Sequence, residues 1–160
     1  MVLWFAGIAV VVVWLVFRDP SLDYRLVVVG ALLPVAVAVV AGGPWLAHTL
    51  VGSAALLAAV MVGTRGRRDR RRRLLALPIG TFLHLVLDGV WTRTELFWWP
   101  VFGLSFPGEV PSFERGFLNV PLELAGAVAL AWAWRRFRLD EPGRRATFVR
   151  TGRLGRDLVA

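Results

Sequence analysis

The sequence contains no cysteine and no lysine, and both absences narrow what the protein can be. Without cysteine it has no disulfide bonds and no thiolate metal sites. All 19 basic residues are therefore arginine, which we interpret as codon bias toward a GC-rich genome rather than as a functional choice. Acidic residues number only 11, so the formal net charge is +8.

Charged residues of either sign are also scarce. They make up 19% of the 160 residues, whereas hydrophobic residues make up 57% and the mean hydropathy is positive. Ordinary soluble domains contain about a quarter charged residues. A water-soluble fold would have to bury several long Val, Leu and Ala runs at once, whereas a lipid bilayer solvates them directly. The composition therefore predicts an integral membrane protein with one compact domain.

Several apolar runs approach the roughly 20 residues that a helix needs to cross a bilayer, for which about 17 is a lower limit. The first run has no basic start and no cleavage signal, so we interpret it as a retained span rather than as a signal peptide. The predicted fold is an all-α membrane bundle of about five transmembrane helices, at about residues 2–17, 26–41, 45–63, 74–91 and 117–134.

Arginine lies almost entirely on one side of this predicted bundle. The loop after the first span has two arginines, the loop after the third has seven and the segment after Trp134 has eight, whereas the opposite side has only Arg93 and Arg115. Cytoplasmic loops of membrane proteins are enriched in basic residues. The split therefore predicts a multi-pass protein of the bacterial plasma (inner) membrane with its N-terminus outside. We divide the chain into a transmembrane domain at 1–138 and a basic, partly mobile cytoplasmic tail at 139–160.

The arginine-rich run at 65–73 has no interleaved aromatic residues, which argues against a nucleic-acid partner. We predict membrane lipids as its partner, because arginines near a bilayer attract anionic head groups. A solvated run that only sets the topology is the alternative. The predicted head-group contacts are Arg68, Arg70, Arg71, Arg72 and Arg73.

The segment at 92–116 contains Trp98, Trp99 and Pro100 in an apolar stretch that is too short to cross a bilayer. It predicts an interfacial or re-entrant element with its tryptophans at head-group level. Two interpretations stay open: an aromatic anchor, or a lid over a site on that face.

Few ionisable residues fall inside the predicted spans, where each is costly unless it has a partner or a function. They are His48, His84, Asp88 and Glu123, and Asn119 lies one turn before Glu123. At about 1.5 Å per residue, all four ionisable groups lie roughly 5 to 10 Å from the outer ends of their spans, in one layer. His84 and Asp88 are four residues apart and share a helix face, as do Asn119 and Glu123.

Two imidazoles and one or two carboxylates from three helices form a ligand set that suits a divalent metal such as zinc. A catalytic site of this kind keeps one position open for a water molecule that the metal activates. In the alternative interpretation, the histidines are interhelical hydrogen-bonding residues, and His84 and Asp88 form a structural pair.

The segment from Pro78 to Trp91 reads PIGTFLHLVLDGVW, which places an H-x-x-x-D motif just before Trp91. Together with Arg25–Pro34, the Ala-His-Thr-Leu stretch at 47–50 and the Trp-Pro at 99–100, it resembles the inner-membrane, metal-dependent hydrolase-like proteins of the YdjM/DUF457 type. The resemblance covers about residues 23–106 and implies metal-ligand roles for His48, His84 and Asp88. Such proteins typically carry Leu-Pro-Asp where this chain has Val35 after Pro34.

Our first hypothesis is therefore a membrane-embedded metal-dependent hydrolase that acts on a lipid-linked or envelope-derived substrate. Glu123 would act as the general base or complete the zinc ligands, and the predicted site mouth consists of Trp91, Trp98, Trp99 and Asn119. Because Val35 replaces a carboxylate, the second hypothesis is a degenerate, metal-free member that serves as a membrane scaffold or lipid-interacting protein. A small transporter is the third, although the chain has no internal repeat.

Overall fold

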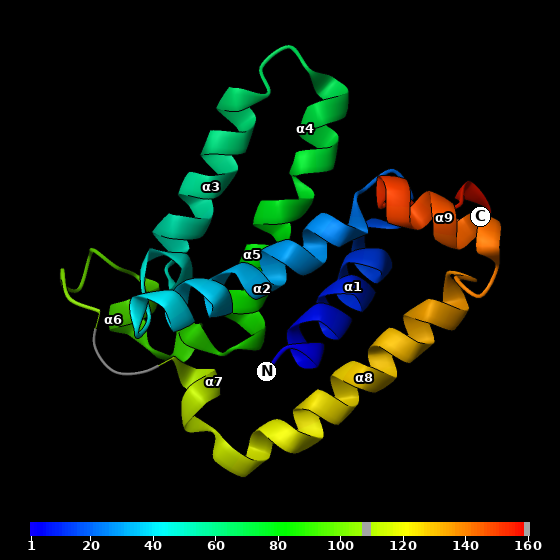
Figure 1. Ribbon diagram of the computed structural model, residues 1–160. Helices are drawn as coiled ribbons and strands as arrows, with labels where there is room; N and C mark the ends of the chain where they lie inside the picture. The colour runs from blue at the N-terminus through cyan, green and yellow to red at the C-terminus, as the bar shows by residue number, and fades with distance from the viewer. Residues whose placement is uncertain (107–109, 159–160) are drawn as a thin grey trace.

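The computed structural model describes residues 1–106 and 110–158, and in this part of the chain the regular elements are all helices, without strands (Figure 1). The predicted all-α fold class is confirmed. The longer helices are α1 (Leu3–Phe17), α2 (Tyr24–Ala41), α3 (Leu50–Gly63), α5 (Ala76–Leu87), α8 (Asn119–Arg136) and α9 (Pro142–Thr151). The short helices are α4 (Arg68–Leu74), α6 (Thr94–Phe97) and α7 (Pro111–Glu114), and 3-10 turns lie at Leu46–His48, Val90–Thr92, Gly116–Leu118 and Arg156–Leu158.

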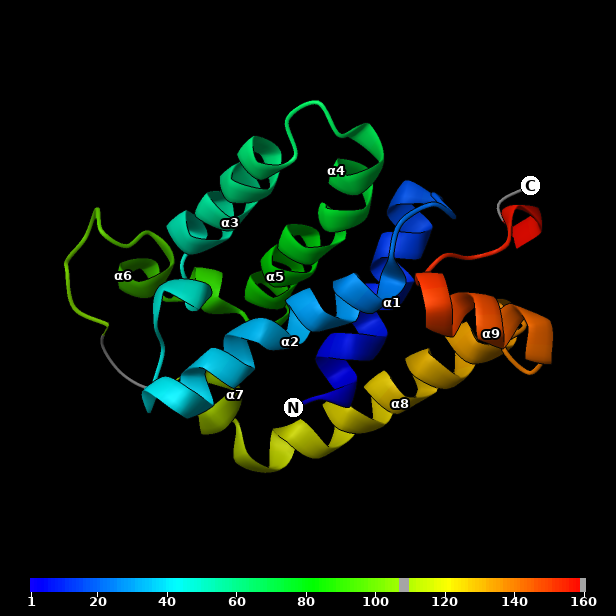
Figure 2. The same ribbon diagram turned by 45° about the horizontal axis from the view of Figure 1, so that its top comes forward.

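Helix α1 lies at the centre of the bundle, in contact with α2, α5 and α8 (Figures 1 and 2). Its side chains Phe5, Ala9 and Val13 are completely buried. The helix is apolar on all sides. A helix that is hydrophobic all round is typical of a protein core or a membrane span.

Glycines allow two pairs of helices to approach closely. Gly7 of α1 meets Gly126 of α8, where an added Cβ on Gly7 would lie 2.3 Å from the carbonyl oxygen of Gly126. Gly30 of α2 meets Gly80 of α5 in the same way, because an added Cβ on Gly80 would lie 2.2 Å from the carbonyl oxygen of Val27. Small residues at helix crossings are the common device of helix packing in membranes.

Two predicted spans form shorter helices than expected. Thr49 has an extended backbone, and its hydroxyl accepts a hydrogen bond from the Gly52 amide at 2.9 Å, so α3 begins at Leu50. This leaves 14 helical residues in the predicted 45–63 span and places His48 in a separate 3-10 turn. Helix α5 has 12 residues because Gly89 takes a left-handed conformation (φ 67°) and ends it.

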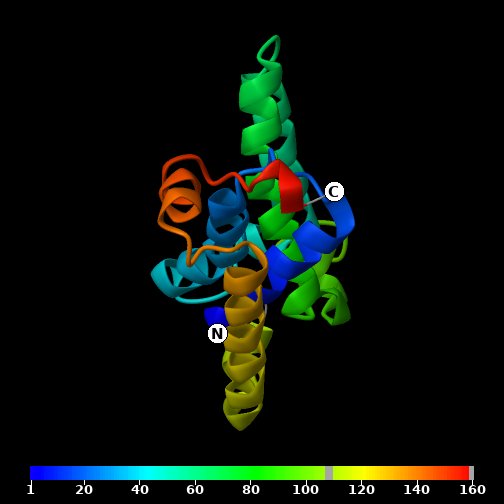
Figure 3. The same ribbon diagram turned by 90° about the vertical axis from the view of Figure 1, so that its right-hand side faces the viewer.

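Within the described residues, α2 and the stretch Gly116–Arg136 are the helices long and apolar enough to cross a membrane, while α1 and α3 are apolar but shorter. Helices α2 and α8 carry apolar side chains on the outside of the bundle, such as Val40 of α2 at 90% exposed and Val128 of α8 at 69%. The first turns of α8 and the α3–α4 hairpin project toward opposite ends of the molecule (Figure 3).

The three arginine-bearing segments meet at one end of the bundle. The Arg73 guanidinium of α4 donates to the carboxylate of Asp23, which caps α2, at 2.8 Å. The Tyr24 amide donates to the Gly152 carbonyl at 2.9 Å, so the segment after α9 docks on the turn between α1 and α2. The predicted tail at 139–160 therefore contains a helix and contacts the bundle through Leu158, and residues 159–160 lie outside the described part.

Candidate metal site

The structure brings together His48, His84 and Asp88, as the sequence predicted. His48 lies in the 3-10 turn before α3, His84 in the last turn of α5, and Asp88 directly after that helix. All three side chains are completely buried, and one ligand atom from each lies within 4.8 Å of the other two. Because zinc–nitrogen bonds are about 2.0 Å, tetrahedral ligand atoms stand roughly 3.3 Å apart. The group can therefore hold a metal ion after a small contraction.

The hydrogen bonds around these residues leave ligand atoms unused. His84 Nδ1 lies 2.8 Å from the Ala31 carbonyl, and since a carbonyl only accepts, Nδ1 carries the proton. Nε2 is then a lone-pair donor, and it lies 3.9 Å from Asp88 Oδ2. Within the described residues, His84 Nε2 and both His48 ring nitrogens have no hydrogen-bond partner, whereas the Asp88 carboxylate also lies against Ser112 and Arg115. Buried polar atoms rarely stay unpaired, so this cluster suits a cation.

A proline explains how α2 and α5 position His84. Pro34 has no amide hydrogen, so the Gly30 carbonyl one turn earlier lacks its usual helical donor. The Thr81 hydroxyl of α5 lies 3.2 Å from that carbonyl and 3.2 Å from the Leu77 carbonyl of its own helix, so its one proton is shared between them. Since Gly30 and Gly80 let the two backbones touch, the neighbouring Ala31 carbonyl reaches the His84 ring. A carbonyl that accepts from one ring nitrogen sets the tautomer and orientation of a histidine whose other nitrogen binds a metal.

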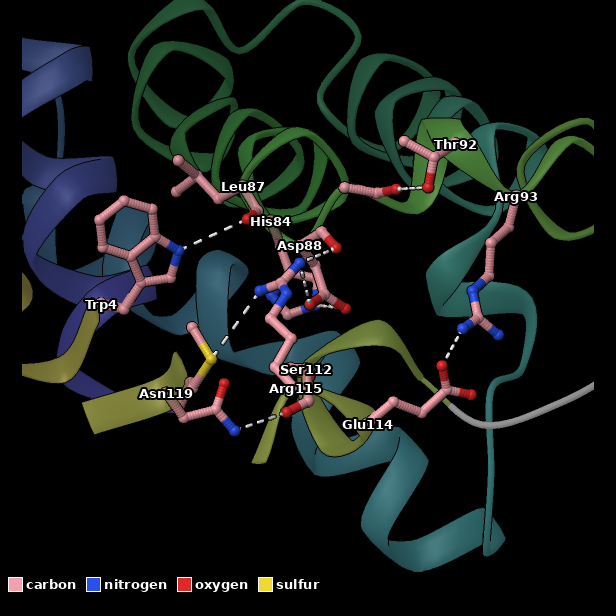
Figure 4. A network of polar contacts seen from close by, with 12 residues as sticks. Trp4, His84, Leu87, Asp88, Thr92, Arg93, Ser112, Glu114, Arg115 and Asn119 are labelled. Atoms are coloured by element: carbon pink, nitrogen blue, oxygen red, sulfur yellow. Dashed lines mark hydrogen bonds and ion pairs between the residues drawn. The ribbon is translucent and has the colours of Figure 1, made fainter. Parts of the chain in front are cut away.

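Arg115 is a site residue that sequence reasoning missed (Figure 4). Its Nη2 atom donates to the main-chain carbonyl of Asp88 at 2.5 Å and lies 3.5 Å from Asp88 Oδ1. The side chain is 23% exposed, so it lies between the buried carboxylate and the surface. The available signal was its isolation: Arg115 is one of only two arginines on the arginine-poor side of the predicted bundle.

Glu123, predicted as the general base, lies on the N-terminus of α1. Its carboxylate accepts hydrogen bonds from the amides of Val2 at 2.5 Å, Leu3 at 2.7 Å and Trp4 at 3.3 Å. The first amides of a helix have no partner within the helix and attract negative charge. Glu123 is not in the group of convergent ligand atoms. Its contacts therefore support a capping role.

The predicted mouth residues lie in the loop after α5 and at the start of α8. Trp91 and Trp98 are 58% and 45% exposed, and Trp99 stacks on Phe106 with ring centroids 5.3 Å apart. The Asn119 side-chain amide donates to the Ser112 carbonyl at 2.8 Å, which ties α8 to α7 (Figure 4).

The predicted lipid-contacting arginines form α4, at the end of the molecule remote from the metal ligands. Arg72 lies 3.9 Å from Asp19, and Arg73 binds Asp23. Burial alone would raise the pKa of Asp23, but hydrogen bonds from Arg25 and Arg73 outweigh it and hold that pKa below its usual value. Arg68 and Arg70 are exposed to solvent.

No model of a protein family, no curated protein and no solved structure matches this chain. The resemblance to the YdjM/DUF457 type therefore stays a prediction, and the functional argument depends on the buried His48, His84 and Asp88 group.

Proposed function

We propose that the protein is a membrane-embedded, metal-dependent hydrolase whose divalent metal ion is held by His48, His84 and Asp88. The observation that carries this proposal is the convergence of three buried ligand atoms within 4.8 Å, two of them on imidazoles. A His₂-carboxylate set with a further position open to water is one of the known compositions of catalytic zinc sites. Zinc is therefore the expected ion.

The proposed bundle crosses the membrane five times, with the arginine-rich end in the cytoplasm. Helices α4 and α5 follow one another through Leu75, whose amide donates to Arg71 and whose carbonyl accepts from Ile79, so the hydrogen-bond ladder continues. The apolar part of this ladder, Leu74 to Leu87, spans about 20 Å at 1.5 Å per residue, about 10 Å less than a 30 Å bilayer core. The arginines at its inner end would extend to the head groups. Apolar residues exposed on α2 and α8 support the same placement.

Each residue around the site has a separate task in this proposal. A bound metal would supply a water molecule of lowered pKa as the nucleophile. The Ala31 carbonyl keeps His84 Nδ1 protonated, so that Nε2 faces the ligand group. Arg115 holds the Asp88 main chain and one carboxylate oxygen, which leaves Oδ2 facing His84. The remaining Arg115 donors can stabilise negative charge that develops on a substrate.

A second candidate function is the metal-free scaffold, and Arg115 favours it. Its guanidinium, 3.5 Å from Asp88 Oδ1, supplies a positive charge to the buried carboxylate without a metal. Val35, which replaces the acid of the resembled family, packs against the apolar core and adds no ligand. Metal content therefore separates the two functions.

The test is metal analysis of protein purified in detergent. We expect about one zinc per chain in the wild type and background levels in His84→Ala and Asp88→Asn, because each removes one of three ligands. Glu95→Gln, an exposed acid outside the ligand group, is the control and should keep its zinc. Hydrolysis of p-nitrophenyl phosphate and p-nitrophenyl acetate should follow zinc content. Zinc at background level in the wild type would exclude the metal-dependent hydrolase and favour the metal-free scaffold.

A further inference from the structure

Two concave surfaces of opposite character follow one another along α4 and α5. The first, which we call the arginine hollow, has a volume of about 380 Å³ and is lined by Arg68, Asp69, Arg71, Arg72 and Leu75. The second, the apolar groove, has a volume of about 420 Å³ and lies between α1, α3 and α5. Its lining includes Val16, Ala54, Leu57, Ile79, Phe82 and Leu83.

The two surfaces form one continuous stripe along α4 and α5. Residues 68, 71, 72 and 75 line the hollow, and residues 78, 79, 82 and 83 line the groove. Spacings of three and four place residues on one helix face, and the hydrogen-bond ladder continues through Leu75. The stripe is therefore basic at one end and apolar at the other.

We propose that this stripe binds one anionic phospholipid, with its phosphate in the arginine hollow and an acyl chain in the apolar groove. The hollow contains three guanidinium groups and the carboxylate of Asp69, and Asp19 lies 3.9 Å from one of the three, Arg72. Ser53 is the only polar residue among the described residues that line the groove, so the groove offers little to a polar ligand. Basic pockets beside membrane helices on the cytoplasmic side bind the head groups of anionic lipids.

The dimensions fit a lipid of the inner leaflet. Leu75 to Phe82 spans about 10 Å at 1.5 Å per residue, within the roughly 15 Å of hydrocarbon that belongs to one leaflet of a 30 Å core. Groove side chains such as Leu57 and Phe82 are 43% and 45% exposed, so the groove opens sideways. The proposal depends on membrane embedding but not on the metal.

Native mass spectrometry of the detergent-purified protein tests the proposal, with dioleoyl phosphatidylglycerol and dioleoyl phosphatidylcholine as probes. Arg68 and Arg71 make no ion pair within the described part of the chain, so their exchange leaves the fold unaffected. In Arg68→Gln/Arg71→Gln we expect phosphatidylglycerol binding to weaken by about 25-fold, at about fivefold per arginine. The control Arg145→Gln/Arg150→Gln, which removes the same charge from exposed positions of α9 outside the hollow, should bind as the wild type does.

The groove is tested separately by Ala54→Phe, which fills it, against Ala55→Phe, which adds the same ring to an adjacent exposed position that does not line it. Ala54→Phe should lose the phosphatidylglycerol adduct while Ala55→Phe keeps it, and Leu57→Trp repeats the test if Ala54→Phe does not fold. Equal weakening by both arginine pairs would mean attraction by diffuse charge alone, and wild-type binding in the filled groove would exclude the acyl chain. Either result overturns the proposal. Zinc content measured in the same samples should not change, so failure of this site is distinguishable from failure of the metal site.

Discussion

Replacing Glu123 by glutamine separates the capping role seen in the structure from the catalytic role that the sequence predicted. Glutamine keeps the size of the side chain but removes the charge that the amides of Val2, Leu3 and Trp4 share and that lies 3.6 Å from the Met1 ammonium. A charge at a helix N-terminus contributes about 0.3 to 1 kcal/mol when exposed and up to about 2 when partly buried. The Glu123 side chain is 31% exposed, so we expect a loss near the middle of that range, about 1 to 1.5 kcal/mol.

The assay is thermal unfolding in detergent, followed by tryptophan fluorescence. For a chain of this size, 1 kcal/mol corresponds to roughly 2 to 4 °C in Tm, so Glu123→Gln should unfold about 2 to 6 °C below the wild type. Glu95→Gln, at an exposed acid of similar size, should change Tm little. Zinc content and hydrolysis per folded molecule should stay at wild-type levels. Unchanged Tm together with lost hydrolysis would refute the capping assignment and restore the general base.

Three further predictions concern the metal, the helix crossing and the arginine-bearing end. Added zinc at 100 times its Kd should stabilise the wild type by about 2.7 kcal/mol, and Asp88→Asn should not respond, as thermal unfolding with and without a chelator will show. Gly80→Leu should prevent folding, because even a Cβ there would lie 2.2 Å from the Val27 carbonyl oxygen, whereas Gly63→Leu, with open space around it, should express and purify normally. The pKa of Asp23 is lower in the folded state than in the unfolded state, so the ionised carboxylate stabilises the fold. This contribution is complete above roughly pH 4 and is lost as the pH falls through the folded pKa. Urea unfolding between pH 6 and pH 3 should therefore show a smaller acid loss in Asp23→Asn than in the wild type.

The helical class and the metal ligand group could be predicted because both follow from periodic patterns. Long apolar runs without cysteine left few alternatives to helices, and the four-residue spacing placed His84 and Asp88 on one face. The arginine distribution gave each helix a direction, which put His48 in the same layer. The structure then groups these three residues.

The roles of Glu123 and His48 could not be predicted from the sequence. They depend on hydrogen bonds to backbone groups, and a pattern of side chains does not show where those groups lie. Glu123 meets amides about 120 positions earlier in the chain, and those donors exist only because α1 begins there. His48 lies in a 3-10 turn because the Thr49 hydroxyl caps α3, so that this helix begins at Leu50. The apolar run at 45–63 gives no sign of this helix start.

The sequence by itself determined that the chain is helical, that its arginines gather at one end and that His48, His84 and Asp88 share a layer. Only the tertiary structure decided what each group touches. It placed Arg115 on Asp88 and the Ala31 carbonyl on His84. The physical reason is that hydrophobic periodicity sets the facing and depth of a side chain, whereas its partners depend on how closely two backbones pack. In this protein that distance is set by the glycines at the helix crossings.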